Sequence, residues 1–226
     1  MLGKPGSVLM KYKLMWILLA VAAVLVLWVG VDLYSVKNVD IRDFDPDEVA
    51  RLDNAMWRTY YAKQPVRMFC QLAELLRSQY HFQYFKSHLV AYHAAKAAFV
   101  FKNGSARADY LQAMPDLVSY YSYLHTISTT PFDVKRATEL ELEWWIVHRQ
   151  RDAHQPGDLG QAVAEAAAEF YKVPATRLME YGMYRAEAMT IRDDRAAEGG
   201  VTEEDWSRIE DLLHKAYRSL WQNLHA

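Results

Sequence analysis

The sequence has little cysteine and lacks the common catalytic signatures. Cys70 is the only cysteine, which excludes an intrachain disulfide and a metal cluster held by several cysteines. Because Cys70 lies in an apolar run, we expect its thiol to be buried. The chain also lacks the patterns G-x-x-x-x-G-K, G-x-G-x-x-G and G-x-S-x-G, which mark phosphate loops, dinucleotide sites and serine hydrolases. Whether the protein is an enzyme is left open, and a non-catalytic role is favoured.

Two further absences concern charge and strand patterning. The formal net charge is −2, and no stripe of Lys and Arg alternates with aromatic residues, so nucleic acid is not an expected partner. No run of alternating apolar and polar residues is rich in β-branched side chains, which argues against strands. With 52% hydrophobic and 24% charged residues, the composition is that of a folded protein rather than a disordered one.

The longest apolar run spans residues 14–31, eighteen residues without a charge. As a helix it would extend roughly 27 Å, close to the ~30 Å hydrocarbon core of a bilayer. Aromatic residues suited to the headgroup region flank it, namely Tyr12, Trp16, Trp28 and Tyr34. We therefore predict a single transmembrane helix over 14–34, with the lipid bilayer as a partner.

A cleaved signal peptide is the competing interpretation of this run. Signal peptides have apolar cores of about 7–15 residues, followed directly by a small-x-small cleavage site. Here the core is longer, and its small residues Ala20, Ala22 and Ala23 lie in its middle. The pattern favours an anchor.

The charges on either side of the anchor predict its orientation. Lys4, Lys11 and Lys13 precede it without any acidic residue, whereas acidic residues dominate the segment after it. Positively charged flanks tend to remain in the cytoplasm. We expect a basic cytoplasmic tail over 1–13 and a C-terminal domain on the periplasmic or another extracytoplasmic side.

Beyond a linker over 35–44, residues 45–226 predict one all-α domain of about eight helices, arranged as a bundle or as stacked helical hairpins. Asp45-Pro46 is a typical helix start, Asn103-Gly104 a typical stop, and Thr202 with Asp205 a typical cap. Pro115 should interrupt the fourth helix. The expected helices are 45–61, 65–78, 82–102, 106–128, 131–151, 158–172, 174–198 and 202–224.

The fifth of these helices is unusually acidic. Glu139, Glu143 and His148 could form a carboxylate and histidine metal site, assisted by His81 or His88. A di-iron bundle usually needs two Glu-x-x-His pairs, and the sequence has none. The favoured alternative is that the glutamates form ion pairs with arginines on other helices, and no cofactor is predicted. The arginines considered are Arg58, Arg77, Arg185 and Arg192.

Aromatic residues form several clusters along the helices. Such stripes usually belong to the core, although three neighbouring tyrosines on one helix cannot all face inward. The clusters therefore also supply candidate contacts to a partner or a ligand. The candidates are Trp57, Tyr61, Tyr120, Tyr121, Tyr123, Trp144 and Trp145.

Three functions remain open. The favoured one is a membrane-anchored interaction module, an accessory or scaffolding subunit of a larger complex with other membrane protein subunits as partners. The second is a helical-bundle metalloprotein with redox activity at the acidic helix. The third is a carrier or sensor of an apolar ligand, held among Trp57, Tyr61, Trp144 and Trp145.

Overall fold

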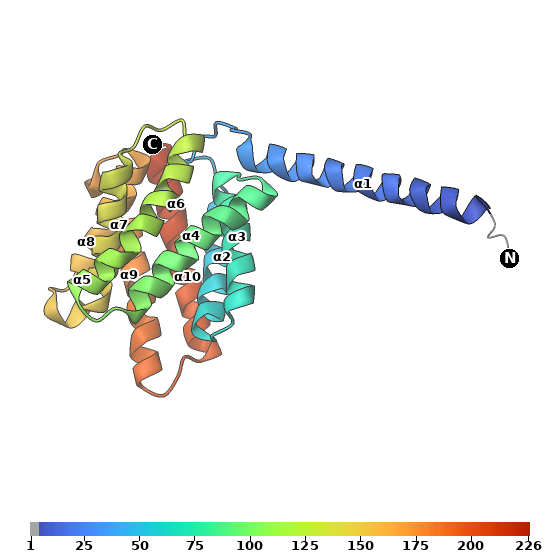
Figure 1. The fold of residues 1–226 in the computed structure, drawn as a ribbon. Coiled ribbons are helices and arrows are strands. Elements are labelled where there is room, and N and C mark those ends of the chain that lie inside the picture. Colours follow the sequence, from blue (N-terminus) through green and yellow to red (C-terminus); the bar gives the residue numbers. More distant parts are fainter. Residues whose placement is uncertain (1–4) are drawn as a thin grey trace.

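The structure of the chain is a computed structural model that describes residues 5–226, with side chains from residue 10 onward. It confirms the all-α class, since the described residues form helices and no named strand. A long helix, α1 (Pro5–Tyr34), stands apart from a helical domain (Figure 1). The domain helices are α2 (Pro46–Tyr61), α3 (Pro65–Tyr80), α4 (Tyr84–Asn103), α5 (Arg107–Tyr110), α6 (Met114–Ile127), α7 (Val134–Arg149), α8 (Asp158–Tyr171), α9 (Met179–Ala197) and α10 (Glu203–Leu224).

Local sequence signals explain most of the helix ends. The Asp45 carboxylate accepts hydrogen bonds from the backbone N–H groups of Asp47 and Glu48, with Pro46 in the first turn. Thr202 and Asp205 form the reciprocal capping box that opens α10. These caps satisfy backbone donors that have no partner within the helix.

Two prolines were expected to mark helix boundaries, and one of these expectations is confirmed. The fourth predicted helix is interrupted as expected before Pro115: α5 is followed by a 3₁₀ turn (Leu111–Ala113) and then by α6. The fifth begins at Val134 and not at Pro131, because the Asp133 side chain accepts from the N–H of Arg136 and so occupies the cap position.

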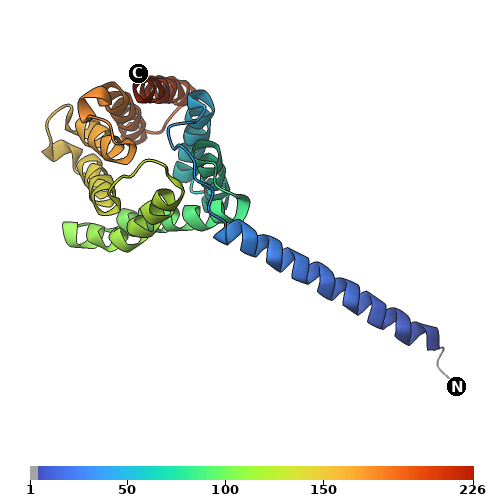
Figure 2. The same cartoon turned by 90° about the horizontal axis from the view of Figure 1, so that it is seen from above.

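Eight of the described helices, each of 14 to 22 residues, form a closed ring. Each packs on the next in the order α2, α3, α4, α6, α7, α8, α9 and α10, and α10 packs against α2. Seen from above in Figure 2, these helices surround a centre. Ring closure thus joins the first and last helices of the domain.

The crossing of α8 and α9 is unusually close because two glycines face each other there. A Cβ atom placed on Gly182 would lie 2.0 Å from the backbone oxygen of Gly160. Only hydrogen fits at this point, so the pair fixes how closely the two helices approach.

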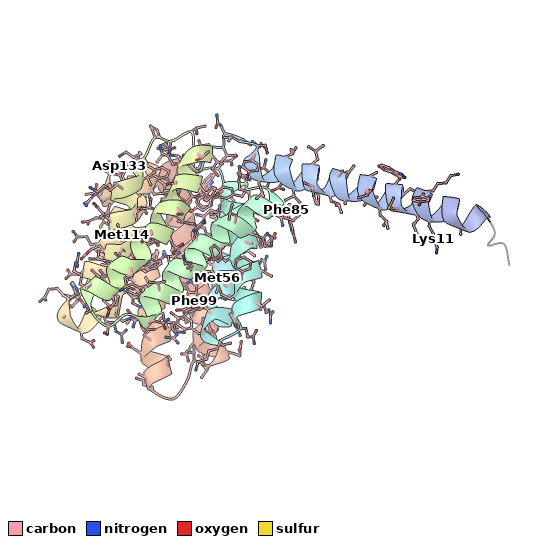
Figure 3. All side chains as sticks on the ribbon, in the orientation of Figure 1. Lys11, Met56, Phe85, Phe99, Met114 and Asp133 are labelled. Carbon is pink, nitrogen blue, oxygen red and sulfur yellow. The ribbon has the colours of Figure 1, made fainter. Side chains whose placement is uncertain are left out.

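Helix α1 contains a stretch, Met10–Tyr34, that is long and apolar enough to cross a membrane and is not buried against the domain. Its last turns are nevertheless attached to α4. The Asp32 carboxylate accepts a 3.0 Å hydrogen bond from the Lys86 N–H, and Lys86 Nζ donates to the Ser35 carbonyl at 2.6 Å. The Trp28 ring packs edge-on against Phe85, with the ring centroids 5.1 Å apart. In Figure 3, Phe85 is labelled beside the C-terminal end of α1 and Lys11 near the N-terminal end of that helix.

The segment between α1 and α2 packs against the domain. Ile41 and Phe44 are buried, and Val39 forms an isolated parallel bridge with Ser128. Its backbone N–H donates to the carbonyl of Ile127 at 2.7 Å. The segment therefore connects α1 to the start of the ring through fixed contacts.

The expectation for Cys70 was wrong, because its side chain is exposed. The buried side of α3 carries Met68, Ala73, Leu75 and Leu76. Cys70 lies off that stripe, so an apolar run in sequence did not mean a buried position on the helix.

Candidate functional site

The ring encloses a cavity of about 730 Å³, which we call the chamber. All eight ring helices contribute to its wall. Its lining is mostly aromatic and aliphatic, and Met56 and Phe99, labelled in Figure 3, are two of the lining residues. A volume of this size is typical of small-molecule sites, which hold about 300–1,000 Å³.

The lining of the chamber is buried at one end, which we call the closed end, and exposed at the other. Near the closed end its lining residues Gln79, Tyr80 and Tyr171 are buried. At the other end the exposed residues Lys63 and Lys102 border it, next to the last turns of α2 and α4. We call this end the mouth; in Figure 1 the ends of α2 and α4 lie away from the junction with α1.

One wall carries a buried ion pair that joins three helices. Arg185 Nη1 of α9 lies 2.8 Å from Asp53 Oδ2 of α2, and the Tyr217 hydroxyl of α10 donates to the same oxygen at 2.8 Å. The Arg185 guanidinium also lies over the rings of Trp57, Tyr181 and Tyr217, at 5.6, 5.8 and 5.4 Å. The carboxylate and the guanidinium therefore satisfy each other where the ring closes.

The facing wall carries Glu141 of α7, which lies among aromatic donors. The Tyr121 hydroxyl donates to one of its oxygens at 2.9 Å, and Trp145 Nε1 donates to the other at 3.0 Å. Burial raises the pKa of the Glu141 carboxyl, although the hydrogen bonds from these side chains act in the opposite direction. Glu141 thus offers an acid of increased proton affinity on a largely apolar wall.

Tyrosine hydroxyls supply the other polar groups of the closed end. Gln79 Nε2 donates to the Tyr171 hydroxyl at 3.0 Å. Burial raises the pKa of Tyr80, Tyr120 and Tyr171 above the ordinary value. These hydroxyls remain protonated at neutral pH and can donate hydrogen bonds.

The mouth is rich in positive charge. Its basic residues are Lys63, Lys102, Arg149, Arg151 and Arg192, against the two acids Asp152 and Asp193. The Arg192 guanidinium stacks on the Tyr61 ring, 3.2 Å from its centroid. Burial raises the pKa of Tyr61 to about 12.

Asp193 is the best-paired acid at the mouth. Its carboxylate lies 2.7 Å from Arg192 Nη1 and 3.0 Å from His148 Nε2. Burial alone would raise the pKa of Asp193, but hydrogen bonds from His148 and Arg192 lower it below the ordinary value. Asp193 therefore remains ionised and offsets part of the charge of Arg192.

Six of the seven aromatic candidates line the chamber: Trp57, Tyr61, Tyr120, Tyr121, Trp144 and Trp145. They come from α2, α6 and α7, so the ring brings together residues nearly ninety positions apart in sequence. Tyr123 is the exception, and its ring stacks on His93. Of the flanking aromatics proposed to anchor α1, Tyr12, Trp16, Trp28 and Tyr34 are all exposed along that helix.

The structure does not bring the three candidate metal ligands together. Glu139 lies 3.9 Å from Lys135 and 3.8 Å from Arg136 on its own helix, Glu143 pairs with Arg107 at 2.8 Å, and His148 faces Asp193. His81 and His88 bind backbone oxygens, those of Asp43 and Tyr84. Across residues 5–226, no three His, Cys, Asp or Glu side chains are grouped to hold a metal ion.

The expectation that these glutamates pair with arginines on other helices holds for Glu143, whose partner Arg107 lies on α5, but not for Glu139. None of the four arginines named as examples is a partner of either glutamate. The four arginines considered each pair with a different acid: Arg58 with Glu203, Arg77 with Glu74, Arg185 with Asp53 and Arg192 with Asp193. Glu139 and Glu143 are 41% and 45% exposed, so they never needed partners inside the ring.

The sequence reasoning missed Asp53 and Glu141 as members of the site. Asp53 carried a usable signal, because it shares a buried helix face with Val49 and Trp57, four positions away on either side. A charged residue on an apolar face requires a buried partner. Glu141 carried no such signal, since its neighbours in sequence alternate between acidic and apolar residues.

Comparisons of the chain with known protein families, curated proteins and solved structures find no match. The description of the protein therefore rests on its own structure, a closed ring of helices with an internal aromatic chamber, attached to one long apolar helix.

Proposed function

We propose that the protein is a membrane-anchored carrier or sensor that binds a small ligand with an apolar body inside the chamber. The observation that carries this proposal is the 730 Å³ cavity lined by aromatic side chains from the ring. A fold stabilised only by its core would close such a volume, because interiors pack nearly as densely as organic crystals.

The arrangement of polar groups supports the same function. Binding sites for small molecules are mostly apolar, with a few placed polar groups that fix the orientation of the ligand. Here Glu141 and the tyrosine hydroxyls project from otherwise apolar walls, and Arg185 is held between three rings. Trp144 and Trp145 provide flat apolar surfaces on α7.

The proposal can be tested on the small molecules that accompany the purified full-length chain. Ala98 borders the chamber, so Ala98→Trp should fill part of it, whereas Ala196→Trp adds the same side chain to an exposed position on α9. We expect mass spectrometry of organic extracts to find a compound enriched with the wild-type chain and with Ala196→Trp, and depleted with Ala98→Trp. Identical extracts from all three would count against a ligand in the chamber.

The membrane part of the proposal rests on α1 and on the charges around it. Its apolar stretch, Met10–Tyr34, is 25 residues long, enough for a bilayer with some tilt. Lys11 and Lys13 lie on its N-terminal side and Asp32 at its C-terminal end. We propose insertion with the N-terminus in the cytoplasm and the ring on the periplasmic or extracytoplasmic side.

Cys70 offers a direct test of this sidedness, because it is the only cysteine of the chain and is exposed. A membrane-impermeant maleimide applied to intact cells should label it. The Cys70→Ser/Ser7→Cys variant, with its thiol in the basic tail, should react only after permeabilisation. The reverse pattern would contradict the proposed orientation.

The role as an accessory subunit of a membrane complex stays a prediction. The aromatic residues that suggested a docking surface lie mostly in the chamber wall, where a small ligand reaches them and a protein partner does not. This is why we place the carrier or sensor function first.

A further inference from the structure

We propose that the ligand of the chamber is an organic anion, with its apolar body between the aromatic walls and its acidic group at the mouth. This inference rests on the proposed ligand-binding function and adds the charge of the ligand and its direction of entry.

The distribution of charge along the chamber is the first argument. Six Lys or Arg residues and four Asp or Glu residues line it in total, and the mouth alone has five against two. A low-dielectric cleft bordered by one sign of charge concentrates its field and attracts the opposite charge. An anion therefore gains most at the mouth, whereas an organic cation would meet like charge on entry.

The pairing of the acids is the second argument. Asp53 is taken up by Arg185 and Tyr217, and Asp193 by Arg192 and His148. Glu141 receives two donors on a buried wall. Three of the four acids that line the chamber thus already have partners, and the fourth, Asp152, is exposed to solvent. They leave little for a cationic ligand to bind inside the chamber.

The basic groups at the mouth are less completely paired. Within residues 10–226, the buried atoms Arg192 Nε and Arg151 Nη1 have no hydrogen-bond partner. Lys102 Nζ lies 5.2 Å from the centroid of the Tyr60 ring, and the Lys102 side chain is exposed. Unpaired guanidinium nitrogens are costly when buried, and a carboxylate, sulfonate or phosphate could satisfy them with charge-assisted hydrogen bonds after a small rotation of either side chain.

The proposal can be tested with a matched pair of fluorescent probes. Dansylglycine and dansylglycinamide share one aromatic body and differ in a carboxylate against a neutral amide. Both are titrated into the full chain in nanodiscs, with empty nanodiscs as the blank, and energy transfer from the chamber tryptophans reports binding. We expect dansylglycine to bind on the order of tenfold more tightly.

A second pair, dodecanoate and dodecanol, is added as competitors to distinguish the source of the anion. If only dodecanoate is preferred over its neutral counterpart, the ligand is a membrane-derived acid. If only dansylglycine is preferred over its amide, the ligand is a water-soluble aromatic acid. Either result supports the proposal.

Variants at the mouth locate the effect. Lys63→Gln/Lys102→Gln changes two exposed residues and should remove most of the preference for the acid. Lys135→Gln removes a charge from an 84% exposed side chain on α7 outside the chamber and should leave the preference unchanged. Arg192→Gln should also remove most of the preference for the acid. An unchanged near-ultraviolet circular dichroism spectrum would show that this variant is folded.

Three results would overturn the inference in different ways. Equal binding of acid and neutral probe in both pairs would refute the anion while leaving the ligand-binding chamber intact. Binding of neither pair would refute the chamber function itself. A preference that survives in the mouth variants and disappears in Lys135→Gln would place the anion elsewhere.

Discussion

Removal of the Asp53 carboxylate tests how the ring is closed. In Asp53→Ala, Arg185 keeps its charge in a position where its side chain is only 12% exposed and loses its sole acidic partner in the described chain. Breaking a buried ion pair by removing one member typically costs about 3–5 kcal/mol. This is a large part of the roughly 5–15 kcal/mol that stabilises a folded domain.

The assay is thermal unfolding of the full chain, followed by near-ultraviolet circular dichroism. For a domain of this size each kcal/mol lowers Tm by about 2–4 °C, so Asp53→Ala should lower it by about 6–20 °C. Glu187→Ala is the control, because it breaks an ion pair with Arg208 in which both side chains are about half exposed. That change should cost no more than about 1 kcal/mol.

A double variant separates the lost pair from an unpaired charge. Asp53→Leu/Arg185→Met replaces the pair by apolar side chains and should recover much of the loss, because buried pairs are often replaceable in this way. If Asp53→Ala is no less stable than Glu187→Ala, the buried pair does not hold the ring closed and the reasoning is refuted.

Three other predictions concern packing, pH and the anchor. Gly182→Ala should destabilise the domain by about 3 kcal/mol in chemical denaturation, because its Cβ would meet the Gly160 backbone oxygen. Folding raises the pKa of Glu141, so the folded wild-type protein binds more protons than the unfolded chain and should lose stability as pH rises above about 4.5. Glu141→Gln should remove this loss, and equal pH dependence of the two proteins would contradict the prediction. Asp32→Ala should speed hydrogen exchange at the Lys86 amide by removing its acceptor, and unchanged exchange would show that α1 is not attached there.

Local signals predicted the helices well because they act within a few residues. The caps at Asp45 and Thr202 and the interruption before Pro115 are properties of single turns, and the structure confirms them. Pro131 misled because Asp133 supplies the side-chain cap further along. Cys70 misled because burial depends on the helix face and not on neighbours in sequence.

The chamber could not be predicted in the same way, because it depends on ring closure. The contact of α10 with α2 joins segments about 150 residues apart, and no periodicity within either helix specifies its partner. The sequence did single out the aromatic residues of the wall, yet it could not show that Trp57 and Trp144 border one space. The position of Asp53 on an apolar helix face did indicate a buried partner, but the identity of that partner, Arg185, becomes apparent only once α2 and α9 are adjacent.

The most direct test of the central claim compares the affinity of dansylglycine for full-length chains whose chamber is empty with its affinity for a variant whose chamber is partly filled by a tryptophan side chain. Wild type and Ala196→Trp should bind it equally, and Ala98→Trp should bind at least tenfold more weakly, because the added ring occupies the space of the probe. Equal affinity in all three proteins would contradict the claim that the helical ring holds its ligand inside.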